Sequence, residues 1–293
     1  MVKSPNRTEK HVAILSFWRS FVVLGSNTET ALLSTGEKGN LLRRLKGLVD
    51  ADYQERLQSQ PAPKKQLIIV GSGCEGTLET LRLNEQLETA SLADAALVIT
   101  PSFYKQNMTQ DALHYHYSTL ADQLQLPLIL YDVPTYTGIS MTVDLVRQLS
   151  QHPNIVGLKD SNADKEKLRE LVDATAGQDF QLICGTASKL LKAFEIGCVG
   201  GICATANCLG EQLVSLHKEF LTNGVSSDAR ALQQRIKHPN LLATRQYGVP
   251  ALKYMTELLF ELAQPLPVRA PLLPLSDAQC AEVRRSLQDN GFL

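Results

Sequence analysis

The chain has 293 residues, of which 44% are hydrophobic, enough for the core of one large α/β barrel or of two smaller domains. Its formal net charge of -1 gives no electrostatic case for binding nucleic acid or an anionic membrane. No apolar run approaches the roughly 20 residues that a membrane span needs. The six cysteines are scattered, which favours buried thiols in a reducing compartment over a disulfide framework or a metal site.

The front of the chain does not fit a regular barrel. Residues 1–11 are polar and basic, and Val12–Phe17 is an apolar run that ends only three residues before the next one at Phe21. A parallel crossover needs about a dozen residues, so the two runs cannot be consecutive parallel strands. We therefore predict that residues 1–20 form a divergent segment and that the first strand–helix unit is missing or altered.

Apolar runs typical of buried strands then alternate with segments of helical apolar spacing. The predicted strands are Phe21–Leu24, Leu67–Val70, Ala96–Thr100, Leu128–Val133, Ile155–Lys159, Gln181–Cys184 and Val199–Ala204. The predicted helices are Ser34–Val49, Thr77–Thr89, Thr109–Leu124, Thr142–Ser150 and Lys165–Thr175. This alternation predicts a parallel sheet with helices outside it. An α/β barrel of the TIM type closes with eight strands, and only seven are found.

The last third of the chain is helical throughout, with proline-rich punctuation at Pro265–Pro274. We therefore predict an α/β barrel over residues 21–208 and, packed on it, a C-terminal helical extension over residues 209–293.

Lys159 ends the buried strand that begins at Ile155, and alternation places it on the same face as Gly157. Gly157 is predicted to leave room beside the amine. Loss of hydration favours the neutral amine, which can attack a carbonyl and form a Schiff base. The alternative is a lysine that escapes to solvent at the strand end.

The run Gly71-Ser72-Gly73-Cys74-Glu75-Gly76 matches the glycine pattern of a dinucleotide-binding loop, between a predicted strand and a helix. That fold also needs an acidic residue at the end of the next strand, whereas Asp94 precedes that strand. The glycines are therefore interpreted as a tight strand-to-helix turn.

Other polar side chains follow strand ends, where parallel α/β folds carry their chemistry. Tyr131 could relay protons beside an imine-forming lysine, or it could be a core tyrosine bonded to a backbone carbonyl. Tyr104 offers a second phenol. Ser26 and Asn27 suit a carboxylate at a helix N-terminus, or form an ordinary helix cap.

Together these segments resemble the dihydrodipicolinate synthase / N-acetylneuraminate lyase family of class I aldolases, and most of all its mitochondrial 4-hydroxy-2-oxoglutarate aldolase branch. The resemblance runs from Phe21 to Leu293. It rests on Gly25-Ser26-Asn27, Gly71–Glu75, Tyr131-x-Val133-Pro134, Leu149–Ser161, Gly185, Gly200-Gly201 and Arg269-Ala270-Pro271-Leu272.

The resemblance implies roles for the residues that match. Lys159 is the Schiff-base lysine, Tyr131 transfers protons, and Tyr104 is lent to the site of a neighbouring subunit. The substrate-binding positions are Ser26 and Asn27 for the pyruvyl carboxylate, together with Ser161 and Gly185.

The resemblance also implies an eight-stranded barrel with a helical C-terminal layer, usually a homotetramer. The implied reaction cleaves 4-hydroxy-2-oxoglutarate to pyruvate and glyoxylate through a covalent imine, without a cofactor or metal. The expected partner is a small 2-oxo acid, with neither nucleic acid nor membrane. The implied compartment is the mitochondrion, although residues 1–11 lack a clear transit peptide and leave the cytoplasm as an alternative.

Three further features depart from the family pattern. Thr28 stands where the family usually has glycine, and Asp50–Lys64 is predicted to be a polar, proline-containing loop insertion. Tyr136 occupies the position of a synthase's arginine, which argues against dihydrodipicolinate synthesis. The alternatives are a related pyruvate-dependent aldolase or synthase, an incomplete product of such an enzyme, or an inactive relative that persists as an oligomer partner through an open sheet edge.

Overall fold

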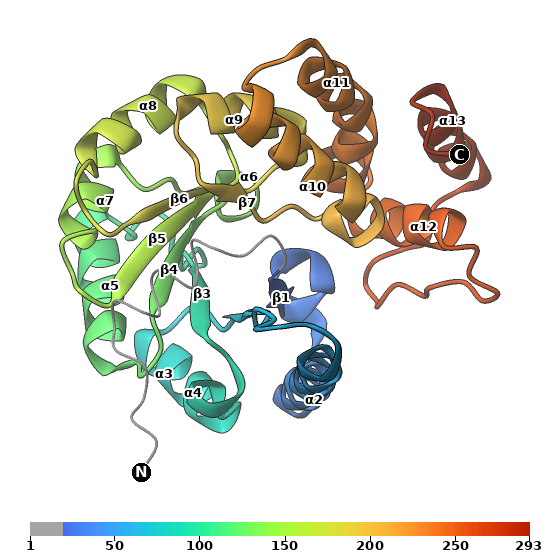
Figure 1. Cartoon of the computed structure of the whole chain (residues 1–293). Coiled ribbons are helices and arrows are strands. Elements are labelled where there is room, and N and C mark those ends of the chain that lie inside the picture. The colour runs from blue at the N-terminus through green and yellow to red at the C-terminus, as the bar shows by residue number, and fades with distance from the viewer. Residues whose placement is uncertain (1–19) are drawn as a thin grey trace. The chain divides into compact units, whose positions relative to one another are not determined.

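The computed structural model describes residues 20–293 (Figure 1). The predicted strand Val12–Phe17, and the divergent segment 1–20 apart from Ser20, lie outside the described residues. The chain divides into two compact units. The first unit comprises described residues 20–26, 33–160 and 173–182, and the second comprises Asn27–Leu32, Ser161–Val172 and Ile183–Leu293.

The strands within the described residues form a seven-stranded sheet whose order follows the sequence. They are β1 (Phe21–Val23), β2 (Ile68–Gly71), β3 (Ala95–Ile99), β4 (Leu128–Asp132), β5 (Ile155–Asp160), β6 (Gln181–Cys184) and β7 (Gly200–Gly201). Strands β1 to β5 pair in parallel in the first unit, and β6 pairs in parallel with β7 in the second. The predicted parallel sheet is confirmed, although β7 covers only two residues of the predicted Val199–Ala204.

Helices of the first unit lie outside its strands, as Figure 1 shows for α3, α4, α5 and α7. Their bounds are α2 (Thr35–Ser59), α3 (Thr77–Gln86), α4 (Thr89–Leu92), α5 (Gln110–Gln123), α6 (Pro134–Thr137) and α7 (Val143–Leu149). Several of these helices begin at an N-cap residue whose side-chain oxygen accepts a hydrogen bond from a backbone N–H of the first turn. Examples are Ser34, Thr109 and Thr142, which are residue types common at this position.

The prediction of a loop insertion over Asp50–Lys64 is wrong for most of its length, because α2 continues to Ser59. Its added turns are polar since they face solvent, and ion pairs four residues apart support them. Lys46 pairs with Asp50, and Arg56 Nε lies 2.8 Å from Asp52 Oδ2.

The second unit is mainly helical, which confirms the prediction for the C-terminal part. Its helices are α8 (Lys165–Ala174), α9 (Leu190–Ile196), α10 (Ala206–Asn223), α11 (Ser227–Leu241), α12 (Val249–Leu259) and α13 (Asp277–Asp289), with a π-helical turn at Leu242–Gln246. Buried side chains from α10, the π-helical turn, α12 and α13 form one apolar core, for example Leu209, Leu242, Met255 and Leu287. Burial of this core holds the C-terminal helices together.

The glycine-rich run after β2 is a close-packed turn. A Cβ on Gly71 would lie 2.1 Å from the carbonyl oxygen of Leu24, and one on Gly73 would lie 2.9 Å from the backbone nitrogen of Ile99. The glycines therefore allow backbone segments to touch, as the interpretation of a tight turn requires.

We predict that Gly71→Ala destabilises the protein by about 3 kcal/mol, because the added methyl must displace backbone. Gly47→Ala is the matched control. A Cβ at Gly47, inside α2, would meet nothing within 4 Å, so this change should stabilise by roughly 0.5–1 kcal/mol. Urea unfolding of the two variants measures both, and equal stabilities would contradict the close approach at Gly71.

Candidate active site

Lys159 and Tyr131 are direct neighbours on β5 and β4, where the register pairs them. Both side chains are buried, with 5% and 4% of their surface exposed. The Lys159 Nζ lies 3.9 Å from the centroid of the Tyr131 ring. The amine therefore sits against an aromatic face that shields it from water, and the alternative of a solvated lysine is excluded.

An irregularity in the ladder creates this pairing. Leu128 pairs with Ile155, but the register shifts after Leu128, so that Ile129 pairs with Gly157. Without the shift, Tyr131 would stand opposite Leu158, and the lysine would point to the other face of the sheet. The extra residue in β5 thus brings the phenol and the amine to one face.

The prediction that Gly157 leaves room beside Lys159 is wrong. A Cβ on Gly157 would lie 2.6 Å from the carbonyl oxygen of Gln181, so the backbone of Gln181 fills that space. Gly157 lets the backbone at Gln181 approach closely, and the Tyr131 ring is what covers the amine.

Ser26 joins the same group in the first unit. Its Oγ donates a hydrogen bond to the Tyr131 Oη over 3.2 Å. The sequence predicts Ser26 as a carboxylate-binding residue and gives no signal for this bond, which spans 105 residues of chain. Tyr131 therefore contacts both residues, with its ring face against the Lys159 amine and its phenol oxygen bonded to the Ser26 hydroxyl.

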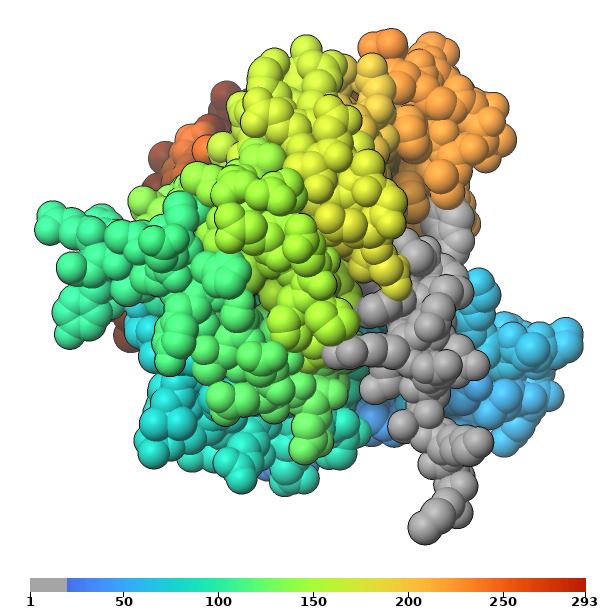
Figure 2. Space-filling model, turned by 90° about the vertical axis from the view of Figure 1, so that its left-hand side faces the viewer, coloured from blue at the N-terminus to red at the C-terminus, as the bar shows by residue number. Residues whose placement is uncertain are grey.

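Tyr104 lies apart from these three residues. It is 68% exposed and packs edge to face against Phe103, with ring centroids 5.0 Å apart. The part of the chain around residues 100–110 projects at the left-hand edge of Figure 2. Within residues 20–293, no hydrogen bond or ring contact links Tyr104 to Tyr131 or Lys159.

Three predicted binding residues belong to the second unit. Gly185 and Ser161 are in close contact, since a Cβ on Gly185 would lie 2.1 Å from the Ser161 Oγ. Asn27 begins the second unit's first segment, in the 3₁₀ turn Ser26–Thr28. Its buried Oδ1 accepts no hydrogen bond from the described residues. The Asn27 Oδ1 is thus a buried acceptor without a hydrogen-bond donor among residues 20–293.

Glu29 fixes the segment that carries Asn27. It is 9% exposed and has a φ of 55°, an uncommon left-handed conformation for a non-glycine residue. Its carboxylate accepts hydrogen bonds of 2.8 Å from Lys253 Nζ and of 2.8 Å from the backbone N–H of Arg269. No local sequence pattern indicates Glu29, because its partners lie more than 200 residues away.

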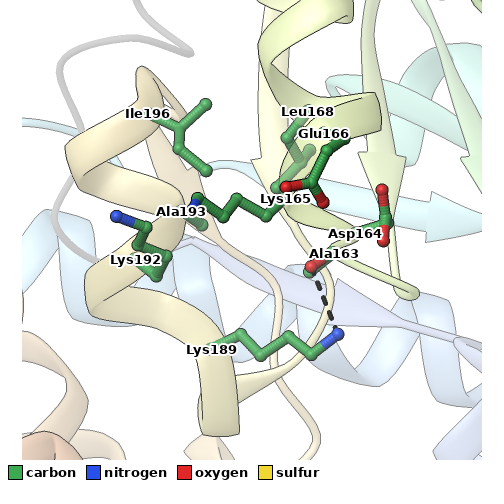
Figure 3. A pocket seen from close by; sticks show the side chains of 9 residues that line it. All are labelled: Ala163, Asp164, Lys165, Glu166, Leu168, Lys189, Lys192, Ala193 and Ile196. Carbon is green, nitrogen blue, oxygen red and sulfur yellow. Dashed lines mark hydrogen bonds between the residues drawn. The ribbon is translucent and has the colours of Figure 1, made fainter.

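A small cavity of about 220 Å³ in the second unit is separate from the predicted site residues (Figure 3). It lies between the segment that begins α8 and the helix α9, and Lys189 Nζ closes one side by donating to the carbonyl oxygen of Ala163 over 3.2 Å. Its lining residues are Ala163, Asp164, Lys165, Glu166, Leu168, Lys189, Lys192, Ala193 and Ile196. None of these is a predicted catalytic or binding residue.

Residues 20–293 contain no group of three or more histidine, cysteine or acidic side chains placed to hold a metal ion. Over the same residues, no helix is long and apolar enough to cross a bilayer.

Comparison with known proteins confirms the family to which the sequence shows a resemblance, but not the 4-hydroxy-2-oxoglutarate aldolase branch within it. Residues 12–290 match the model of the dihydrodipicolinate synthetase family. The 4-hydroxy-tetrahydrodipicolinate synthase of Methanoculleus marisnigri is 29% identical over 270 residues, which cover 92% of this chain and 86% of the relative. The enzyme of the same name from Erwinia tasmaniensis is 28% identical over 97% of this chain and 90% of its own.

Solved structures agree on the fold. A dihydrodipicolinate synthase from Acinetobacter baumannii, complexed with pyruvate, superposes with a TM-score of 0.81 at 25% identity, covering 98% of this chain and 94% of that one. The synthase of Thermotoga maritima superposes with a TM-score of 0.82 at 23% identity, covering 98% of this chain and 92% of that one.

We predict that Glu29→Gln destabilises the second unit by about 2 kcal/mol at pH 7, the loss expected for a hydrogen bond between charged groups. Burial acts to raise the pKa of Glu29, but the bonds from Lys253 and Arg269 outweigh it and lower the pKa. A depressed carboxyl pKa stabilises the fold above the unfolded pKa of about 4.3 and ceases to do so as pH falls through the folded value.

The difference in the free energy of unfolding between wild type and Glu29→Gln should therefore be largest at neutral pH and should decrease below about pH 4. Thermal melts between pH 3 and pH 8 measure it. Glu170→Gln, at an exposed position on α8, is the control and should show no such trend. A difference that stays constant with pH would contradict the assignment to the Glu29 carboxylate.

Proposed function

We propose, for a chain that belongs to the dihydrodipicolinate synthetase family, that it cleaves 4-hydroxy-2-oxoglutarate to pyruvate and glyoxylate through a Schiff base on Lys159. The family consists of carbon–carbon lyases that join a lysine to pyruvate without an external cofactor. The observation that carries the proposal is the buried Lys159 amine against Tyr131, with Ser26 bonded to the phenol.

The first step forms the imine. The neutral Lys159 amine attacks C2 of the 2-oxo acid, and the carbinolamine must gain a proton on its oxygen to lose water. The Tyr131 ring covers the amine, and the Ser26 hydroxyl donates a hydrogen bond to the phenol oxygen. Tyr131 supplies the proton that leaves with water, and the nitrogen keeps one of its own protons, so the product is the positively charged imine. The Tyr131 phenolate then accepts the proton that the C4 hydroxyl loses in the second step.

The second step breaks the bond between C3 and C4. The positively charged imine draws the electron pair of that bond toward nitrogen while the C4 hydroxyl loses its proton. Glyoxylate departs and leaves an enamine, which takes a proton at C3. Water then attacks the resulting imine, frees the Lys159 amine and releases pyruvate. Tyr131 is the residue we assign to these proton transfers, because it alone of the two predicted tyrosines contacts Lys159.

Substrate binding is assigned to the residues that match the family's binding positions. Ser26 and Asn27 hold the pyruvyl carboxylate, and Ser161 and Gly185 contact the same molecule. Tyr104 serves the site of a neighbouring copy in a homotetramer, a role in keeping with its exposure and its separation from Lys159.

Synthesis of 4-hydroxy-tetrahydrodipicolinate is the second candidate function. The names of the two bacterial and archaeal relatives favour it. It shares the imine and enamine with the cleavage reaction and differs in the aldehyde. Tyr136, at the position of the synthase's arginine, favours cleavage, since a phenol cannot pair with a carboxylate as a guanidinium does.

Three further predictions remain part of the proposal. They are the absence or alteration of the first strand–helix unit, the division into a barrel over 21–208 and a helical extension over 209–293, and residence in the mitochondrion.

Borohydride trapping tests the proposed chemistry. Reduction of the protein with pyruvate should add one pyruvyl group, which peptide mapping should place on Lys159. Lys159→Arg is the control and should give no adduct. Release of glyoxylate from 4-hydroxy-2-oxoglutarate then decides between cleavage and synthesis. A folded protein without an adduct would overturn the Schiff-base proposal and favour an inactive oligomer partner.

We predict that Tyr131→Phe lowers kcat for cleavage by roughly 10²–10³-fold, the usual contribution of a positioned proton donor. The ring that covers the amine remains, so pyruvate binding should change little. Ser26→Ala should lower kcat by about tenfold, since it removes one hydrogen bond to the phenol. Steady-state kinetics and the rate of adduct formation measure both; an unchanged kcat in Tyr131→Phe would exclude the phenol as the proton donor.

A further inference from the structure

The loop that follows β3 is held by a carboxylate outside the predicted site. Glu75 accepts hydrogen bonds from the backbone N–H groups of Ser102 over 2.7 Å and Phe103 over 2.8 Å, and from the Ser102 hydroxyl over 3.3 Å. The loop then turns on itself, with the Asn107 N–H bonded to the Tyr104 carbonyl over 2.8 Å. The backbone position of the next residue, Lys105, is therefore fixed.

The Lys105 side chain lies over the end of α6. A Cβ placed on Gly138 would be 3.6 Å from both Nζ and Cδ of Lys105. Gly138 has a φ of 68° and closes α6 by donating its N–H to the Pro134 carbonyl over 2.8 Å. The amine is thus placed against the short helix that follows the strand carrying Tyr131.

Helix α6 is close to the reacting pair. It begins at Pro134, three residues after Tyr131, and carries Tyr136. Tyr136 is 51% exposed, and its pKa is raised by partial burial and by the electrostatic effect of the Tyr131 phenol. Lys105, Tyr136 and Tyr131 all belong to the first unit.

The Lys105 charge is available to a ligand. Its Nζ pairs with no carboxylate among residues 20–293, whereas Lys46, Lys192 and Lys253 each have an acidic partner. The side chain is exposed, so water and small anions reach it.

We propose that Lys105 binds the second, distal carboxylate of the substrate and so selects a dicarboxylic 2-oxo acid. This inference rests on the proposed function, in which Ser26 and Asn27 hold the first carboxylate. 4-Hydroxy-2-oxoglutarate carries its second carboxylate on C4, on the far side of the bond that breaks. Lys105 is a cation that the structure places against the C-terminal end of α6, the helix that follows the strand carrying Tyr131.

A comparison of two substrates tests the inference. 4-Hydroxy-2-oxopentanoate has a methyl group where 4-hydroxy-2-oxoglutarate has its distal carboxylate, and its cleavage gives pyruvate and acetaldehyde. The measured quantity is the ratio of kcat/KM for the dicarboxylate to kcat/KM for the monocarboxylate. In Lys105→Met the ratio should fall about tenfold, through the KM of the dicarboxylate, the size of one charge-assisted hydrogen bond.

Control variants separate binding of the distal carboxylate from a structural effect of the substitution. Lys105→Arg should keep most of the ratio, and Lys237→Met, an exposed lysine on α11, should leave it unchanged. In wild type the ratio should decrease as salt increases, because an exposed charge pair is screened. Borohydride trapping with pyruvate, which has no distal carboxylate, should proceed equally in wild type and Lys105→Met.

The possible outcomes distinguish a failure of the Lys105 inference from a failure of the proposed Schiff-base function. If Lys105→Met still traps pyruvate and its ratio matches wild type, Lys105 does not bind the distal carboxylate, and the Schiff-base function stands. An equal loss of kcat/KM for both substrates would likewise overturn the inference, because it indicates a structural role at the end of α6. If wild type itself forms no adduct on Lys159, the proposed function falls, and the inference falls with it.

Discussion

The contact between the Lys159 amine and the Tyr131 ring is the constraint on which the rest of the candidate site depends. It exists because β4 and β5 pair in a register that shifts by one residue after Leu128. In a sheet, a slip of one residue exchanges the two faces, so the shift decides whether amine and phenol meet at all. One backbone irregularity in a buried strand pair therefore brings together the proposed nucleophile and the proposed proton donor that covers it. Apolar packing on both strands holds the register.

Each unit has a carboxylate that holds loop backbone in place. Glu75 binds the N–H groups at the base of the loop that carries Tyr104, and Glu29 binds Lys253 and the Arg269 N–H beside the segment that carries Asn27. Each acts on loop backbone, where an ionised acceptor forms strong hydrogen bonds. Loops with few apolar contacts can be held in one conformation by this means, which a ligand-binding loop requires.

The elements built from local patterns were predictable from the sequence, and those built from distant contacts were not. Apolar runs located β1 to β6, and strand-end polarity located Tyr131 and Lys159. The extension of α2 was missed because a solvent-exposed helix has no apolar period to reveal it. The bond from Ser26 to Tyr131 and the Glu29 pair join residues 105 and 224 positions apart, and no local pattern encodes such contacts.

At the ends of β4 and β5, strand alternation puts the proposed reactive side chains on one face and the aspartates that follow them on the other. Tyr131 and Lys159 share one face, so the residues that follow them, Asp132 and Asp160, point to the other and are fully buried. The Asp132 carboxylate accepts from the Ser140 hydroxyl and the Met141 N–H over 3.0 and 3.2 Å, which fixes the far end of the loop that carries Tyr136. Because this anchor lies on the face away from the amine, the side chains of that loop can differ between relatives without disturbing the reactive pair. Under the proposed function, specificity for the aldehyde can therefore change through loop residues such as Tyr136, while the residues assigned to the imine chemistry stay in the strands.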